Sequence, residues 1–191
     1  MDQYCHYIET IDANGDVRSN GTVFMVKHRS QTLLLTAAHT LRKYNDFIFP
    51  DFPNWHADHI RLHDDRVELY KTRYQPLFTV YRKNHRELLD AIVLPHAGPG
   101  GPIDFDYQPG DAVKLCGWRK SPDRTKYILD SEILDVRGWD MRIDLSQHTR
   151  LQRGGISGGG VYTERGFVGI YFADDIGKPT AHAVCLKYLL K

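Results

Sequence analysis

The sequence predicts an all-β protein, because short β-rich segments recur along it and helical periodicity is scarce. These segments are separated by turn residues such as Gly, Pro, Asn and Asp, which is typical of antiparallel barrels or of a sandwich. The chain has 191 residues, of which 41% are hydrophobic and 26% charged. This size and composition indicate one compact globular unit rather than a disordered chain.

The expected strands share a high content of β-branched, aromatic and leucine residues. In order they are Thr22–Lys27, Thr32–Thr36, Ile60–Leu62, Val67–Lys71, Leu77–Tyr81, Ala91–Leu94, Ala112–Cys116, Tyr127–Val136, Met141–Leu145, Gly160–Tyr162 and Phe167–Phe172.

Short sequence patterns predict how these strands are connected. Three consecutive leucines in Thr32–Thr36 predict a strand covered on both faces, and a hairpin with Thr22–Lys27, entered by a turn at Gly21, is expected. The Gly- and Pro-rich segment Ala97–Gly110 predicts a connection that divides the chain into an N-terminal unit, 1–100, and a C-terminal unit, 101–191. The apolar spacing in Val184–Leu190 predicts a short C-terminal helix.

Charge and cysteine usage restrict the partners. The 25 basic and 24 acidic residues nearly cancel, so no nucleic acid or membrane partner is expected. The first twenty residues lack the pattern of a secretory signal, and no apolar run is long enough for a membrane helix. Cys5, Cys116 and Cys185 are scattered and odd in number, which favours a reducing, cytoplasmic location over a disulfide framework. No cofactor or metal is expected.

One serine stands between paired glycines in the segment Gly154–Gly160, GGISGGG. A nucleophilic serine needs a tight turn in which backbone N–H groups converge on a developing oxyanion, and glycines permit that turn. An ordinary Gly-rich hairpin turn with an incidental Ser157 explains this segment equally well.

Two further segments carry a histidine and an aspartate. The run LLLTAAH ends in His39, where small neighbours leave room for a substrate beside a general base. The run LLDAIVLP starts an apolar strand with Asp90, a carboxylate that a histidine ring would satisfy. Taken singly, a surface histidine and a solvated aspartate are the commoner explanations.

Together the three segments have much greater weight, because they follow the order His, Asp, Ser. The runs TAAH, DAIVL and GISGGGV resemble the segments around the triad of trypsin-like serine peptidases, over about Gly21 to Val184. The resemblance implies a chymotrypsin-like fold of two antiparallel β-barrels with the active site between them. It implies His39 as base, Asp90 as its orienting acid, Ser157 as nucleophile, and an oxyanion hole formed by the N–H groups of Gly155 and Ser157.

The chain also departs from that family. Ile156 stands where digestive and clotting relatives carry the aspartate that pairs with a new N-terminus, so activation by zymogen cleavage is not expected. In this respect the chain is closer to bacterial HtrA-like catalytic domains. If the resting enzyme is held off, a misplaced loop at Gly154–Ser157, corrected by a regulatory protein partner or by multimerisation, is expected.

The specificity pocket is expected to differ from that of trypsin. Its floor position falls on Leu151, and its walls are expected from Gln152–Gly154, from Tyr171–Asp175, which includes Phe172 and Ala173, and from Ala181–Ala183. Asp174 or Asp175 would attract a basic side chain, and His182 would read an acidic or amide side chain. The alternative is that both acids lie in a solvated loop and His182 is structural.

Three other segments have simpler explanations. The segment WHADHIRLHD, with His56, His59, His63, Asp58 and Asp64, lacks a zinc signature and is expected to be a solvated loop. Arg82–Arg86 is expected to be a charged turn, and Phe47–Trp55 a loop at the barrel edge.

Two functions follow from the resemblance: an endopeptidase acting on protein or peptide substrates, or an interaction module on a protease fold with an idle triad. An α/β-hydrolase is disfavoured by the chain order.

Overall fold

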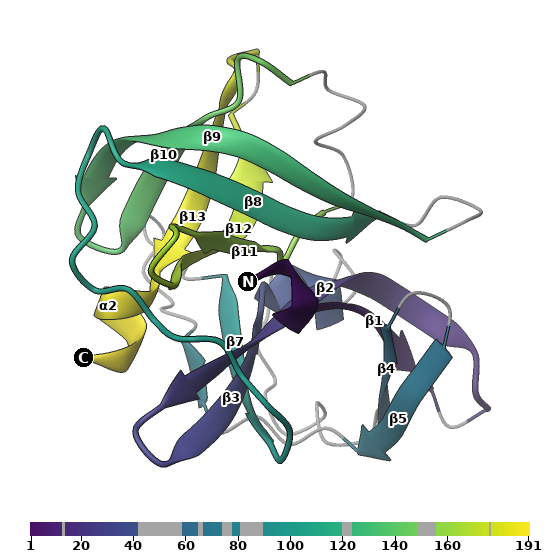
Figure 1. The fold of residues 1–191 in the computed structure, drawn as a ribbon. Coiled ribbons are helices and arrows are strands. Elements are labelled where there is room, and N and C mark those ends of the chain that lie inside the picture. Colours follow the sequence, from purple (N-terminus) through teal and green to yellow (C-terminus); the bar gives the residue numbers. More distant parts are fainter. Residues whose placement is uncertain are drawn as a thin grey trace.

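The computed structural model describes residues 1–12, 14–41, 59–64, 67–73, 78–80, 90–119, 124–148, 156–175 and 177–191. Two antiparallel sheets, one from each half of the chain, lie against one another, and a short helix ends the chain beside the second sheet (Figure 1). The prediction of an all-β protein with a short C-terminal helix is confirmed. The architecture is consistent with two barrels.

The N-terminal sheet has the strand order β5-β4-β1-β2-β3-β7-β6. Its strands are β1 (Cys5–Ile11), β2 (Val17–His28), β3 (Gln31–Thr36), β4 (His59–Asp64), β5 (Val67–Arg73), β6 (Phe78–Val80) and β7 (Ala91–His96). Short 3-10 helices, η1 (Asp2–Tyr4) and η2 (Ala38–Leu41), precede β1 and follow β3. The predicted hairpin is confirmed as β2 and β3, which pair from Phe24 opposite Leu35 to His28 opposite Gln31.

The C-terminal sheet closes into a barrel with the order β10-β13-β12-β11-β8-β9. Its strands are β8 (Ala112–Arg119), β9 (Thr125–Arg137), β10 (Asp140–Asp144), β11 (Gly160–Tyr162), β12 (Phe167–Asp174) and β13 (Thr180–Cys185), followed by α2 (Leu186–Leu190). No helix in these described parts of the chain is long and apolar enough to cross a membrane.

Two strands and two boundaries differ from expectation. The sequence analysis missed β1 and β13, because neither shows a clean alternation of apolar and polar residues. The helix begins at Leu186 rather than Val184, because Val184 and Cys185 still pair within the barrel. Gly21 does not form a turn: it lies inside β2, opposite Ile8 of β1.

Alternating side chains of β2 and β3 build two separate cores. Val23, Met25 and Leu34 belong to the interior of the N-terminal sheet, whereas Phe24 and Leu35 belong to the core shared by both sheets. All five are buried. The three leucines of β3 therefore cover both faces of the strand, as predicted. A third core, which includes Leu115, Ile143 and Val161, fills the closed barrel.

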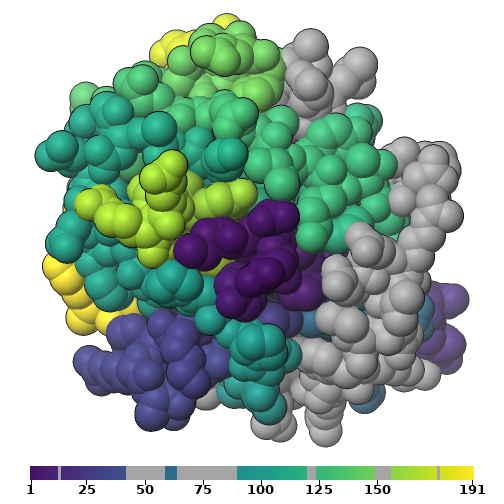
Figure 2. All heavy atoms as spheres, in the orientation of Figure 1, coloured from purple at the N-terminus to yellow at the C-terminus, as the bar shows by residue number. Residues whose placement is uncertain are grey.

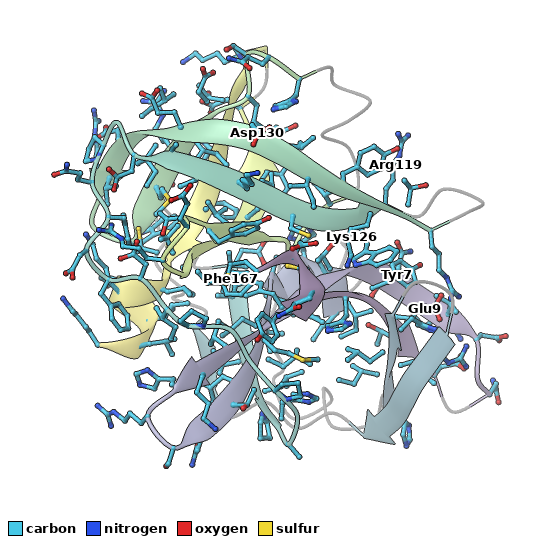
Figure 3. The ribbon with its side chains drawn as sticks, viewed as in Figure 1. Tyr7, Glu9, Arg119, Lys126, Asp130 and Phe167 are labelled. Carbon is cyan, nitrogen blue, oxygen red and sulfur yellow. The ribbon has the colours of Figure 1, made fainter. Side chains whose placement is uncertain are left out.

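The shared core fixes the two sheets against each other. Phe24 stacks on Phe167 with ring centroids 4.6 Å apart, and the indole N–H of Trp118 donates to the carbonyl of Cys5 over 3.0 Å. Figure 3 labels Phe167 where the barrel meets the N-terminal sheet, and Figure 2 shows the first residues of the chain at the surface along the same boundary. All three cysteines are buried, and none forms a disulfide.

The segment 97–111 connects the two sheets, as the Gly- and Pro-rich composition predicted. Gly101 exchanges backbone hydrogen bonds with Met25 and Lys27 of β2, at 3.0 and 2.7 Å. Three residues later the connection reaches the barrel, where the N–H of Asp104 donates to the carbonyl of Phe167. Because the connection pairs with both sheets, the division into 1–100 and 101–191 stays a prediction about folding units.

Candidate active site

Asp90 and His39 meet because β3 and β7 are antiparallel neighbours. Thr36, the last residue of β3, pairs with Ile92 near the start of β7, so η2 lies beside the residue that precedes β7. The backbone N–H of His39 donates to Oδ1 of Asp90 over 2.9 Å, and Nδ1 of the ring lies 2.5 Å from Oδ2. Both side chains are partly buried, with 18% and 13% exposed.

This pairing determines what the ring can do. An ionised carboxylate only accepts hydrogen bonds, so Nδ1 of His39 carries the hydrogen and Nε2 keeps its lone pair. A histidine in this tautomer can take a proton at Nε2 while the carboxylate of Asp90 stabilises the resulting positive charge.

Ser157 lies in a tight turn just before β11 of the closed barrel. The N–H of Gly159 donates to the carbonyl of Ile156 over 3.0 Å, which closes the turn around the serine. The carbonyl of Ser157 in turn accepts a hydrogen bond from the N–H of Thr22 over 2.9 Å. The turn that precedes β11 is thereby attached to β2, the central strand of the N-terminal sheet.

Glycines allow this attachment. Gly158 has φ +82°, and a Cβ there would lie 2.1 Å from the carbonyl oxygen of Thr22 and 2.3 Å from Oγ1 of Thr36. At Gly21 a Cβ would lie 2.6 Å from Cγ2 of Thr40. Only glycine permits such close backbone contact without displacing the neighbours.

Three buried threonines connect the serine turn to the histidine turn. The hydroxyl of Thr36 donates to the carbonyl of Thr22 over 2.6 Å and lies 2.7 Å from the hydroxyl of Thr40, the residue after His39. The hydroxyl of Thr22 accepts from the N–H of Trp118 in the barrel over 2.6 Å. A continuous set of hydrogen bonds therefore leads from Ser157 to the residue beside His39.

The expected oxyanion hole is described only in part. Gly155 and Gly154 lie outside the described residues, and Ser157 is the one expected donor within them. No hydrogen bond joins the Ser157 hydroxyl to Nε2 of His39 or to another residue that the structure describes. The expectation of a misplaced Gly154–Ser157 loop stays a prediction.

Ile156 anchors the serine turn through apolar contact. It is fully buried in the core of the closed barrel. A Cβ on Gly117 of β8 would lie 2.5 Å from Cβ of Ile156, so the missing side chain of Gly117 makes room for it. At this position the resembled family carries an aspartate that pairs with a new N-terminus, whereas here Ile156 makes an apolar contact.

Some of the expected pocket residues lie on β12 and β13, and the others lie outside the described residues. Asp174 accepts a hydrogen bond from the hydroxyl of Tyr171 over 2.7 Å. Phe172 instead packs beside His182, with ring centroids 6.0 Å apart. Ala173 of β12 pairs with His182 of β13. Leu151 and Gln152 lie outside the described residues.

Both ring nitrogens of His182 are engaged. Nδ1 lies 2.9 Å from a carboxylate oxygen of Asp140, and Nε2 lies 2.9 Å from one of Asp175. Burial alone would lower the pKa of His182, but the hydrogen bonds to Asp175 and Asp140 outweigh it and raise the pKa. Both nitrogens of His182 thus already contact carboxylates of the protein itself, and the expectation that it reads an acidic or amide side chain stays a prediction.

The expected solvated loop around His59 and His63 is wrong for the part that the structure describes. Both residues lie in β4, and His63 is buried with Nε2 3.1 Å from Glu9. Arg124, which precedes β9, approaches Nδ1 of His63 at 3.2 Å and Glu9 at 3.3 Å. Figure 3 labels Glu9 and Tyr7 on the N-terminal sheet below the start of β9. The histidine therefore belongs to a polar contact between the sheets.

The surroundings of His63 lower the pKa of its ring. Burial lowers the pKa of His63, and repulsion from Arg124 lowers it further against the opposing effect of Glu9. Arg124 also lies 5.0 Å from the ring centroid of Tyr7. His56, Asp58, Phe47–Trp55 and Arg82–Arg86 lie outside the described residues.

The sequence analysis missed the threonines whose hydrogen bonds link the serine turn to the histidine turn. Thr22, Thr36 and Thr40 are ordinary strand and turn residues in the sequence, and their contacts span both sheets. The signal available for them was Gly21, since a glycine inside a strand marks close backbone contact.

Similar proteins are found by comparison of structures and not by comparison of sequences. No family model and no curated protein matches the chain. Among solved structures, a serine endoprotease from Yersinia pestis matches with a TM-score of 0.65 and 15% identity, over 96% of this chain and 59% of that one. The chain thus spans about 59% of the length of that relative.

Two further structures match over most of both chains. The Rv3671c protease in an inactive form has a TM-score of 0.62 and 13% identity, over 98% of this chain and 86% of that one. A structure described for the coupled folding and binding of the intrinsically disordered Sesbania mosaic virus VPg protein has a TM-score of 0.61 and 17% identity, with 97% and 88% covered. The chain has the fold of trypsin-like serine proteases.

Proposed function

We propose that the protein is a serine endopeptidase that hydrolyses peptide bonds with His39, Asp90 and Ser157. The observation that carries the proposal is the double hydrogen bond between His39 and Asp90, at 2.9 and 2.5 Å, close to a serine turn bound to Thr22. The serine-protease fold of the structural neighbours supports the same conclusion.

The chemistry follows from these groups. The Ser157 hydroxyl attacks the carbonyl carbon of the scissile bond while Nε2 of His39 takes its proton, and Asp90 stabilises the imidazolium. The N–H groups of Gly155 and Ser157 are proposed to bind the negatively charged oxygen. Collapse of the tetrahedral intermediate breaks the C–N bond, and His39 gives its proton to the leaving amine. Water then hydrolyses the acyl-enzyme by the same steps.

Peptide-bond hydrolysis tests the proposal. The protein is incubated with a peptide library, and new termini are identified by mass spectrometry. Cleavage by the wild type and by Ser146→Ala, a surface control on the barrel, together with its loss in Ser157→Ala, is expected. Among the described residues, the hydroxyl of Ser146 bonds only to Asp144, so the control should leave the site intact.

The competing function is an interaction module whose triad is idle. The missing hydrogen bond between Ser157 and His39 in this structure is the observation in its favour, although such bonds often tighten only when substrate binds. Cleavage that is absent from the wild type, even after addition of candidate regulatory partners, would favour the module.

A further inference from the structure

Thr40 directly follows His39 in η2, and hydrogen bonds fix it from two sides. Its hydroxyl lies 2.7 Å from the hydroxyl of Thr36 and 2.7 Å from the carbonyl of Ala37. Its carbonyl accepts a hydrogen bond from the hydroxyl of Ser19 on β2 over 2.5 Å. Thr40 is only 2% exposed, so water hardly competes for these groups. The turn that carries His39 is therefore tied to both β2 and β3.

The side chain of Thr40 and the serine turn meet at one point of β2, which is Gly21. A Cβ on Gly21 would lie 2.6 Å from Cγ2 of Thr40, the carbon of its methyl group, and 3.0 Å from the carbonyl oxygen of Ser157. The absent side chain of Gly21 is what lets both groups approach the strand. The histidine turn and the serine turn are therefore in contact with the same residue.

The hydroxyl of Thr40 gives a second route to the serine turn, through Thr36 and Thr22. Each threonine hydroxyl has one hydrogen, so the two hydrogens of Thr36 and Thr40 serve the contact between them and the contacts to two carbonyls, those of Thr22 and Ala37. The N–H of Thr22 in turn donates to the carbonyl of Ser157 over 2.9 Å. Without the Thr40 hydroxyl, Thr36 would bond only to Thr22, and the hydrogen-bonded link to the histidine turn would be lost.

We infer that Thr40 is a positioning residue, which holds the imidazole of His39 at the distance from Ser157 that proton transfer requires. The inference rests on the proposed endopeptidase function and adds a residue to that same site. Asp90 fixes the direction of the ring within the N-terminal sheet, whereas the contacts of Thr40 tie the histidine turn to the serine turn. A general base must lie within hydrogen-bond reach of its proton, and a misplacement of about 1 Å can slow a reaction roughly 100-fold.

Two variants separate the hydroxyl of Thr40 from its methyl group. Thr40→Val has nearly the same shape but no hydroxyl, and Thr40→Ser keeps the hydroxyl but loses the methyl group at Gly21. Neither leaves the carbonyl of Ala37 unpaired, because that carbonyl also accepts from the N–H of Thr40 over 3.1 Å, so both variants are expected to fold. Thr163→Val is the matched control, since Thr163 is also buried and its hydroxyl donates to Asp104 over 2.7 Å.

Amide hydrogen exchange tests the link without catalysis. The N–H of Thr22, which donates to Ser157, should exchange roughly 5- to 10-fold faster in Thr40→Val than in the wild type, because the loss of a buried hydrogen bond eases local opening. The N–H of Gly110, which donates to Ile133 in the barrel over 2.8 Å, should exchange at the same rate in both and is the reference for global unfolding. Exchange at Thr22 should stay as in the wild type in Thr40→Ser and in the control variant.

Peptide cleavage by the same variants shows whether the link serves catalysis. In Thr40→Val, kcat should fall roughly 10- to 100-fold with little change in KM, because the reacting groups are misplaced while the surface that binds substrate is unchanged. Thr40→Ser should recover most of kcat, and Thr163→Val should match the wild type. An unchanged kcat in Thr40→Val, a loss carried by KM instead, or unchanged exchange at Thr22 would overturn the inference. Faster exchange at Thr22 in a protein that cleaves nothing would contradict the proposed function and leave the link through Thr40 standing.

Discussion

Asp90 accepts two hydrogen bonds from one residue, His39: one from its backbone N–H and one from its ring Nδ1. The first fixes the carboxylate relative to the turn, and the second fixes the tautomer and direction of the ring. An aspartate that only balanced charge on a surface histidine would not need the backbone bond. The two bonds fix the direction of Nε2, as the proposed function requires.

Replacement of Asp90 by asparagine should disable catalysis without unfolding the protein. The amide retains the shape of the side chain but no longer favours the hydrogen on Nδ1 or stabilises the imidazolium, so kcat should fall on the order of 10⁴-fold. Peptide hydrolysis is the measurement. Asp130→Asn, at a carboxylate 77% exposed on the barrel surface, should leave kcat unchanged. An equal loss in both variants would argue against the orienting role.

The serine turn should not tolerate a side chain at Gly158. Gly158→Ala introduces a Cβ that meets the backbone of Thr22 and also strains φ, so a loss of about 2 kcal/mol or more in the free energy of unfolding is expected. Gly110→Ala is the matched control, because Gly110 has φ +91° but no atom within 4 Å of its Cβ position. Chemical denaturation of both variants measures the difference. Equal losses would mean that backbone strain alone, and not the contact with Thr22, fixes the turn.

The contact between the sheets at Glu9 should contribute to stability. Glu9→Gln leaves Arg124 and Arg61, which lies 3.5 Å from the carboxylate, beside a buried neutral group. Removal of one partner of such a buried contact costs roughly 3 kcal/mol. Glu132→Gln, at an exposed position of β9, is the control and should cost little. Unfolding free energies that match in the two variants would show that this contact does not hold the sheets together.

His182 should make stability depend on pH. Its pKa is raised in the folded protein, since the hydrogen bonds to Asp175 and Asp140 outweigh burial, so folding favours the protonated ring. The contribution is fully present below the unfolded value of about 6.5 and is lost as the pH rises through the folded pKa. The stability difference between wild type and His182→Asn should therefore be larger at pH 6 than at pH 9. A difference that grows with pH would contradict this assignment.

The elements that could be predicted from the sequence are those in which neighbouring residues show by themselves whether a segment is buried or forms a connection. The leucines of β3 and the Gly- and Pro-rich connection are local signals, and both predictions are confirmed. Strand β1 was missed because it is buried along its whole length, so apolar and polar residues do not alternate.

Within the candidate site, only the residues proposed to carry the chemistry could be predicted from the sequence. His39 and Asp90 stand in distinctive runs, and the structure brings them together. The threonine contacts depend on the packing of β2 against the barrel, and the pairing of Tyr171 with Asp174 depends on a bulge at Phe172. Neither leaves a pattern in the sequence, because both arise from strand register across segments far apart in the chain.

Reaction with a fluorophosphonate tests the central proposal most directly, because this reagent phosphonylates a serine only when a general base and an oxyanion site activate it. Peptide mapping of the treated wild type should locate a single adduct on Ser157, and His39→Ala and Ser157→Ala should remain unlabelled. No adduct on the wild type, with or without a regulatory partner, or an adduct on Ser157 that persists in His39→Ala, would contradict the proposal.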